Sequence, residues 1–273
     1  MPSTPADAVW VSLRAEVARK AEAEPVLASY LHATVLNHKS LEDALSFHLA
    51  SKLASPNLAA MSMREFMDEA FSSSPELQRA LRADLEAVAR RDPAAQGFSE
   101  PFLHYKGFHA LEAYRVAHWL WRAERPALAC YLQNRISEIF AADIHPAAQI
   151  GKGIFIDHAT SVVIGETAVV EDDVSMLHEV TLGGTGKTTG DRHPKVRQGV
   201  LIGAGAKILG NVEIGACSKI AAGSVVLRDV PPHTTVAGVP AVIVGVHEED
   251  APARSMEHAL AERRLAASSG SDK

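Results

Sequence analysis

The stretch DIHPAAQIGKGIFIDHATSVVIGETAVV, residues 143–170, carries aliphatic residues in a six-residue register that continues to about residue 244. The second position of each hexad is often small or turn-forming, and the fifth is often small. The aliphatic residues in register are Ile144, Ile150, Ile156, Ile164, Val170, Met176, Leu182, Ile202, Ile208, Ile214, Ile220 and Val226. This is a hexapeptide repeat, in which each hexad supplies one short parallel strand and one turn, and about three hexads close a triangular coil.

The register shifts twice, which indicates where the coils are interrupted. The first shift, of two residues, falls between Ile156 and Ile164, and the second falls between Leu182 and Ile202. The second follows residues 183–194, which contain four glycines and no aliphatic residue and end in basic residues. We therefore predict a protruding loop over 183–195, and loops on a rigid scaffold often carry function.

The preceding residues predict helices. Leu77, Leu81, Leu85 and Val88 share one helix face, Ser74 and Pro75 form a helix start, and Asp92-Pro93 ends the helix. We predict a helical domain over residues 1–142, a solenoid domain over 143–245 and a polar, mobile tail over 246–273, with a short helix possible around 255–265.

Composition excludes several classes of protein. The 273 residues carry a net charge of −6, which argues against a nucleic-acid binder, although residues 183–245 carry +4 and would suit a small polyanion. We find neither a signal peptide nor an apolar run of membrane-spanning length. Cys130 and Cys217 are far apart and lack metal-ligand spacing. We therefore expect a cytoplasmic protein.

Histidines in or beside the coils are the candidate catalytic residues. His158 and His178 occupy the same hexad position and are expected to stack about 5 Å apart, with His193 in the following loop. A histidine that accepts a proton needs a carboxylate to orient it, and either Asp143 or Asp157 would serve. Because no serine or cysteine lies in a nucleophile motif, direct transfer is more economical than a covalent intermediate.

Several segments closely resemble the bacterial serine O-acetyltransferase family, a family of hexapeptide-repeat acyltransferases. The shared segments are Asp143-Ile-His-Pro-Ala, Asp157-His-Ala-Thr, Ile164-Gly-Glu-Thr-Ala-Val, Val180-Thr-Leu-Gly-Gly-Thr-Gly-Lys, Gly190-Asp-Arg-His-Pro-Lys, Val236-Ala-Gly-Val-Pro-Ala, Lys52-Leu-Ala-Ser-Pro, Arg91-Asp-Pro-Ala and Lys106-Gly-Phe-His-Ala-Leu-Glu-Ala-Tyr-Arg. The likeness covers about residues 8–245. It implies an α+β protein, an N-terminal α-helical domain followed by a left-handed parallel β-helix.

The resemblance also implies transfer of acetyl from acetyl-CoA to the hydroxyl of L-serine, without a metal, in cysteine biosynthesis. His158 would be the general base and Asp143 its orienting partner. Asp92 and Asp157 would hold the serine ammonium, Arg192 would bind its carboxylate, and His193 would assist. Acetyl-CoA would lie in a groove between neighbouring subunits, near Gly184, Ala204, Gly205, Ala222 and Gly223, with Lys219 on a phosphate.

The resemblance further implies a hexamer built from two trimers and feedback inhibition by L-cysteine. Family members bind O-acetylserine sulfhydrylase through a C-terminal tail that ends in isoleucine. This sequence ends Gly270-Ser-Asp-Lys273, so the resemblance does not decide that partnership.

Three other functions remain as alternatives. The first is a hexapeptide acetyltransferase for another small acceptor, disfavoured because Asp92, Asp157 and Arg192 together suit a zwitterion. The second is a zinc hydratase with His158, His178 and His193 as ligands, which leaves the aspartates and Arg192 without roles. The third is a non-catalytic docking scaffold, against which the pairing of His158 with an aspartate argues.

Overall fold

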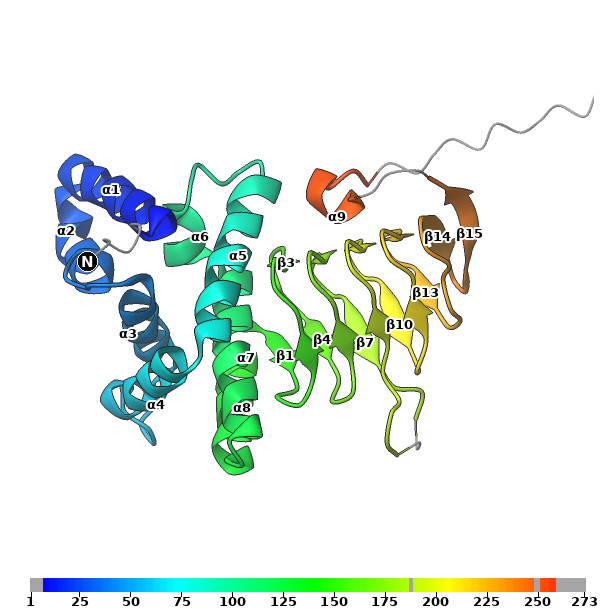
Figure 1. Cartoon of the computed structure of the whole chain (residues 1–273), viewed down its shortest axis with the longest axis horizontal. Coiled ribbons are helices and arrows are strands. Elements are labelled where there is room, and N and C mark those ends of the chain that lie inside the picture. Colours follow the sequence, from blue (N-terminus) through cyan, green and yellow to red (C-terminus); the bar gives the residue numbers. More distant parts are fainter. Residues whose placement is uncertain (1–6, 187–188, 248–250, 259–273) are drawn as a thin grey trace, which may run out of the picture.

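A helical half packs on one end of a solenoid of parallel strands in the computed structural model, which describes residues 7–186, 189–247 and 251–258 (Figure 1). The main helices are α1 (Ala8–Ala23), α2 (Ala28–Leu31), α3 (Leu41–Leu53), α4 (Ala60–Ser73), α5 (Pro75–Arg91), α6 (Ser99–His104), α7 (Lys106–Arg122) and α8 (Pro126–Phe140). A 3₁₀ turn (Pro25–Leu27) and a π turn (His32–Leu36) flank α2. The predicted fold class, helices followed by coils of parallel strands, is confirmed.

The solenoid has three parallel faces. One face holds β1 (Ala142–Ile144), β4 (Val162–Ile164), β7 (Thr181–Gly183), β10 (Lys207–Leu209) and β13 (Val225–Val226). The second holds β2 (Gln149–Ile150), β5 (Val169–Val170), β8 (Lys195–Val196) and β11 (Glu213–Ile214). The third holds β3 (Phe155–Ile156), β6 (Ser175–Met176), β9 (Leu201–Ile202), β12 (Lys219–Ile220) and β14 (Thr234–Gly238), with β15 (Ala241–Val246) added antiparallel.

The aliphatic register explains this packing. The aliphatic residues in register stack as a column inside the solenoid. Each lies in or beside a strand, and all but the partly buried Ile150 are buried. Between Ile156 and Ile164 the two additional residues form a corner in which His158, Ala159 and Ser161 have positive φ. Between Leu182 and Ile202 the sequence analysis missed Val196, which is fully buried in the column and resumes the coil after the loop (Figure 1).

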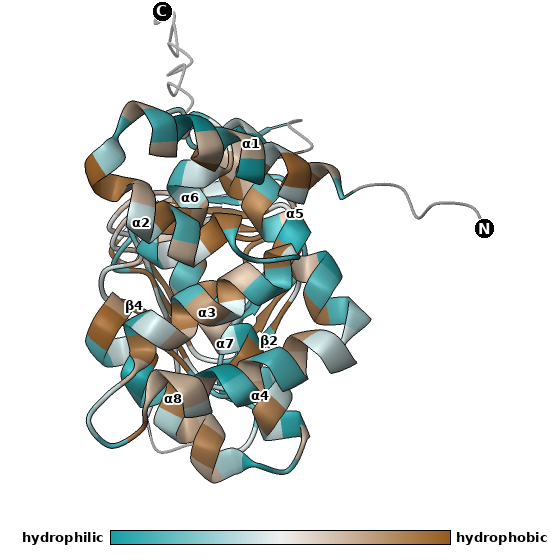
Figure 2. Ribbon diagram, turned by 90° about the vertical axis from the view of Figure 1, so that its left-hand side faces the viewer, coloured by the Kyte–Doolittle hydropathy of each residue, from teal (hydrophilic) through white to brown (hydrophobic). Residues whose placement is uncertain are grey.

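Helix α5 links the helical half to the solenoid. The Ser74 hydroxyl caps it by accepting a hydrogen bond from Leu77 N at 3.3 Å, as the sequence predicts, and the helix ends at Arg91. Its predicted apolar face, with Leu77, Leu81, Leu85 and Val88, is buried. Figure 2 shows hydrophobic and hydrophilic stretches alternating along helices of this half, as expected for helices that bury one face.

The C-terminal part differs from the predicted mobile tail. Residues 252–255 form a short helix, α9 (Pro252–Ser255), whose Pro252 and Ala253 are buried. Helix α9 contacts α5 and β9. The rest of the predicted helix, from residue 259, and the tail end lie outside the described residues. Among the described helices, none combines the length and apolar character that a membrane span requires.

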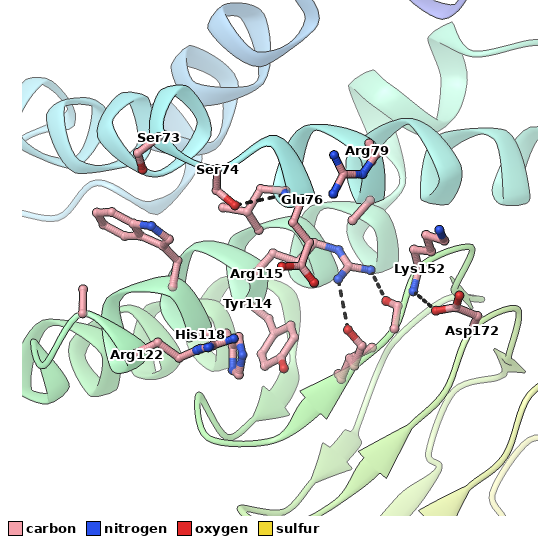
Figure 3. Close-up of a pocket in the computed structure, with 16 residues that line it drawn as sticks. Ser73, Ser74, Glu76, Arg79, Tyr114, Arg115, His118, Arg122, Lys152 and Asp172 are labelled. Carbon is pink, nitrogen blue, oxygen red and sulfur yellow. Dashed lines mark hydrogen bonds between the residues drawn. The ribbon is translucent and has the colours of Figure 1, made fainter.

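A buried ionic cluster joins α5 and α7 to the first coil; we call Asp84, Glu112 and Arg115 the Arg115 cluster. Arg115 Nη2 lies 2.5 Å from Asp84 Oδ2 and donates to Gly151 O at 2.6 Å, and Asp84 Oδ1 accepts from Ile154 N at 2.8 Å. Figure 3 shows Arg115 between the helices and the coil, in a pocket of about 630 Å³ that none of the predicted site residues lines. Helices and coil thus share one set of buried bonds.

Glu112 completes the Arg115 cluster as a neutral group. It is fully buried, and both its carboxyl oxygens lack a hydrogen-bond partner among the described residues. Burial, reinforced by the negative charge of Asp84, holds the pKa of Glu112 well above its usual value. Burial also raises the pKa of Asp84, but the charge of Arg115 opposes that rise, and the contact of Arg115 with Asp84, at 2.5 Å, is shorter than that with Glu112, at 3.7 Å. Asp84 is therefore the carboxylate that pairs with the guanidinium.

We predict that Asp84→Ala lowers the free energy of unfolding by about 3–5 kcal/mol, because the buried Arg115 guanidinium loses its closest carboxylate and keeps only the longer contact to Glu112, at 3.7 Å. Urea denaturation followed by circular dichroism measures this. Glu112→Gln is the matched control, and should change stability by less than about 1 kcal/mol since it replaces a neutral buried group with another. Equal losses from the two substitutions would contradict the assignment of Asp84 as the charged partner.

Candidate active site

A pocket of about 760 Å³ lies where the C-terminal end of α5 and the start of α7 meet the corner between β3 and β4. Asp92, Tyr105, Asp157, His158 and His178 all line it. The structure therefore brings three of the predicted site residues, Asp92, Asp157 and His158, to one cavity, although Asp92 comes from the helical half.

Asp92 caps the C-terminus of α5. Its backbone N donates to Val88 O at 3.0 Å, and its Oδ1 accepts from Ala94 N at 2.8 Å, so the turn into Pro93 fixes its side chain. Tyr105 hydrogen-bonds to the Asp92 carboxylate. Burial of Tyr105, together with the charge of Asp92, raises the pKa of the phenol, which therefore stays protonated as a donor.

His158 stands on the corner between β3 and β4 with φ of 58° and a side chain that is 71% exposed. Its Nε2 lies 3.7 Å from Asp157 Oδ1, and its ring centroid lies 5.8 Å from that of His178. The two histidines therefore lie one above the other on neighbouring coils, as predicted, with their rings edge to face at 66°. His178 Nδ1 is buried and has no hydrogen-bond partner among the described residues.

Asp157 is destabilised as an anion in this pocket. Burial raises its pKa, the nearby His158 opposes that rise, and the negative charge of Asp92 adds to it. Two carboxylates that repel each other beside an exposed imidazole favour a bound cation, which would relieve the repulsion.

The structure places Arg192 and His193 at a different corner, at the end of the loop before β8, where they lie against the turn between β4 and β5. The Thr167 hydroxyl oxygen accepts from Arg192 N at 3.0 Å and His193 N at 3.1 Å. Arg192 Nη2 donates to Glu166 Oε2 at 2.7 Å. Neither Arg192 nor His193 lines the His158 pocket. Within one chain, the predicted site is therefore divided between two corners.

His193 is held as a neutral ring. It is 7% exposed, and its Nδ1 accepts from Thr167 N at 3.2 Å, so the ring proton sits on Nε2. Burial lowers the pKa of His193, with the Arg192 charge acting in the same direction. A β-carbon on Gly165 would lie 2.1 Å from the ring, so only glycine fits there.

Asp143 is not bonded to His158. It lies on β1, and its Oδ1 accepts from Gln133 Nε2 at 2.7 Å. Across the described residues, no hydrogen bond or ion pair joins Asp143 to His158, for which Asp157 is the paired carboxylate.

Most of the residues predicted for acetyl-CoA lie in a row above His158. The corners stack through backbone bonds from Glu179 N to Thr160 O, from Gly205 N to His178 O and from Gly223 N to Ala204 O, at 2.8, 2.9 and 2.8 Å. Gly205 and Gly223 have φ of 72° and 69°, and a β-carbon on Gly223 would meet nothing within 4 Å. The row that contains Ala204, Gly205, Ala222 and Gly223 is therefore an open edge.

The other two predicted acetyl-CoA residues lie away from this row. Gly184 follows β7, where a β-carbon would lie 3.5 Å from Arg192 O, and Lys219 lies on β12. Gly184 is thus a neighbour of the Arg192 corner.

Sequence reasoning missed Tyr105, Glu166 and Thr167 as site residues. Glu166 and Thr167 lie in a quoted motif, but only the fold shows that they hold Arg192 and His193. Tyr105 follows α6 in a segment without a motif. The described residues contain no group of three or more histidine, cysteine, aspartate or glutamate side chains arranged to hold a metal ion. His193 and the His158–His178 pair lie on different corners.

Known proteins resemble both halves of the chain. The family model "Serine acetyltransferase, N-terminal" matches residues 9–113, and "Bacterial transferase hexapeptide (six repeats)" matches residues 193–228. The serine acetyltransferase of Salmonella typhimurium is 58% identical over 257 residues, which cover 94% of each chain.

Solved structures of serine acetyltransferases are also similar to this chain. A Brucella abortus serine acetyltransferase in complex with coenzyme A has a TM-score of 0.87 and 56% identity, and covers 88% of this chain and 96% of its own. A serine acetyltransferase in complex with cysteine has a TM-score of 0.90 and 55% identity, and covers 92% and 98%.

Proposed function

Since this chain belongs to the serine acetyltransferase family, we propose that it transfers acetyl from acetyl-CoA to the hydroxyl of L-serine, giving O-acetyl-L-serine and CoA in cysteine biosynthesis. The observation that carries this proposal is the pocket in which Asp92 and Asp157 flank an exposed His158. Two carboxylates suit the serine ammonium, and the imidazole beside them suits a hydroxyl that must lose a proton.

The reaction proceeds by direct transfer. His158 takes the proton of the serine hydroxyl while the hydroxyl oxygen attacks the thioester carbonyl carbon. The tetrahedral intermediate then expels the CoA thiolate, which receives the proton from the imidazolium. Asp143 is proposed to orient His158 on the family resemblance alone, and would have to leave Gln133 to do so.

Acetyl-CoA is proposed to lie along the open row of Ala204, Gly205, Ala222 and Gly223, which leads directly to His158. Lys219 would meet a phosphate. Gly184 lies beside Arg192 and would reach the ligand from the other side of the groove.

The serine carboxylate is proposed to bind Arg192 and His193 of a neighbouring copy. Both residues lie outside the pocket of their own chain. If three solenoids associate around a threefold axis, the Arg192 corner of one chain would lie beside the His158 corner of the next. Val163 and Leu227, exposed by 38% and 50% on and next to the face between these corners, supply apolar surface for a trimer.

Two trimers are proposed to join through the helical half as a hexamer. Val11, Val26, Leu27 and Tyr30 are exposed apolar residues on α1, the 3₁₀ turn and α2, at the end away from the solenoid (Figure 1). We propose a cytoplasmic location on the low cysteine content of the chain.

L-Cysteine is proposed as an inhibitor that competes with serine. It carries the same ammonium and carboxylate, so the same anchors would bind it, and its thiol would meet His158, where a thiolate–imidazolium pair is favourable.

Substitution of His158 tests catalysis. His158→Ala should lower kcat by about 10²- to 10⁴-fold, because the serine hydroxyl loses its general base. Release of the CoA thiol, followed with a thiol reagent in the presence of L-serine, measures this. His32→Ala, at an exposed helical histidine, should leave kcat unchanged. Full turnover by His158→Ala would remove the base assignment, and activity only on homoserine or a sugar would remove the acceptor assignment.

Substitution of Arg192 tests carboxylate binding. Arg192→Ala should raise the KM for serine and the inhibition constant for cysteine by a similar factor, about ten- to a hundredfold, because both lose one charge-assisted carboxylate partner. Arg197→Ala is the matched control, since that guanidinium pairs with Glu171 and Glu213 on the outer face. Cysteine inhibition that is abolished while serine affinity stays normal would place the inhibitor at a separate site.

A further inference from the structure

Helix α9 packs on a polar group formed by Arg91, Asp173 and Ser175. Ala253 is fully buried, and its carbonyl oxygen accepts a hydrogen bond from the hydroxyl of Ser175 at 2.7 Å. Its backbone N donates to Gly199 O at 3.3 Å. Figure 1 shows α9 beside the C-terminal end of α5 and above the solenoid, and α9 contacts both α5 and β9.

Beneath α9, the Arg91 guanidinium is held on two sides. It donates to Ser175 Oγ at 3.0 Å and to Asp173 Oδ1 at 2.8 Å, and its side chain is 3% exposed. The other oxygen of Asp173 accepts from Arg254 Nη2, on α9, at 2.8 Å. The carboxylate of Asp173 is thus shared between the last residue of α5 and α9, and the hydroxyl of Ser175 is shared in the same way.

Arg91 immediately precedes Asp92. Because the end of α5 is bonded through Arg91 to the solenoid, the backbone of the next residue has little freedom. Asp92 N still donates to Val88 O within α5. The direction of the Asp92 side chain therefore depends on the position of the last turn of α5. The bonds beneath α9 therefore set the position of a carboxylate that faces Asp157 and His158 across the pocket.

We propose that α9 positions the serine-binding carboxylate: through Asp173 and Ser175 it fixes Arg91, and through Arg91 it fixes Asp92. Arg91 and Asp173 are positioning residues that do not touch the substrate. The inference rests on the proposed function, because Asp92 is the ammonium anchor. Serine binding would therefore depend on the docking of the C-terminal segment. The acetyl-CoA row lies on a different edge of the solenoid from Asp173, which stands between β5 and β6.

Asp173→Asn is the most direct test. Asp173 has φ of 59°, a left-handed conformation that asparagine tolerates, so the substitution removes the charge and keeps the backbone. The KM for serine should rise about tenfold, whereas kcat and the KM for acetyl-CoA should change less than about twofold. Calorimetric titration with L-serine alone should show the same rise in Kd.

A second variant guards against misfolding. The Arg254 side chain is 63% exposed, so Arg254→Ala should fold normally and still raise the serine KM in the same direction by a smaller factor. Two matched controls should leave serine binding unchanged. Asp172→Asn changes a neighbouring carboxylate that accepts from Lys152 N, and Arg90→Ala changes an exposed arginine that pairs with Glu86.

The outcomes separate this inference from the proposed function. A fall in kcat with an unchanged serine KM in Asp173→Asn would mean a merely structural role and would overturn the inference. If Asp173→Asn leaves the serine KM unchanged while Asp92→Asn raises it, the inference is overturned and the proposed function stands. A wild-type protein that binds no serine would overturn both.

Discussion

The buried pairing of Arg115 with Asp84 determines where the two halves of the chain meet. One guanidinium bonds a carboxylate on α5 and carbonyl oxygens of the first coil, so α5, α7 and the solenoid share a single set of contacts. Because a buried charge without its partner is costly, the helices have one favourable position on the coil. That position brings Asp92, at the end of α5, to the corner that carries Asp157 and His158.

Functional residues lie where the six-residue register is interrupted. The first interruption adds two residues and forms the left-handed corner on which His158 stands. The second inserts the loop that ends in Arg192 and His193, and Thr167 of the preceding coil holds both of their backbone amides. The regular coils supply a rigid frame, and the interruptions add the backbone turns that display charged side chains.

The sequence predicted the fold because the aliphatic register is periodic and the helix signals at Ser74 and Asp92 are local. It also predicted the stacking of His158 and His178, which follows from the register. It did not predict Val196, because the inserted loop hides its register, nor the docking of α9, which depends on Ser175 and Asp173 nearly 80 residues earlier. Asp143 could not be located against His158 by spacing, and in the structure it bonds Gln133 instead.

The central claim is that one site is built from two chains, with His158, Asp92 and Asp157 from one copy and Arg192 from its neighbour. Co-expression of a His158→Ala chain with an Arg192→Ala chain tests it, with kcat/KM for serine measured well below the KM. With random mixing of equal amounts, the whole population should regain about a quarter of the wild-type value, because one site in four then pairs an intact His158 with an intact Arg192. Activity no higher than that of the two parent variants would contradict the claim.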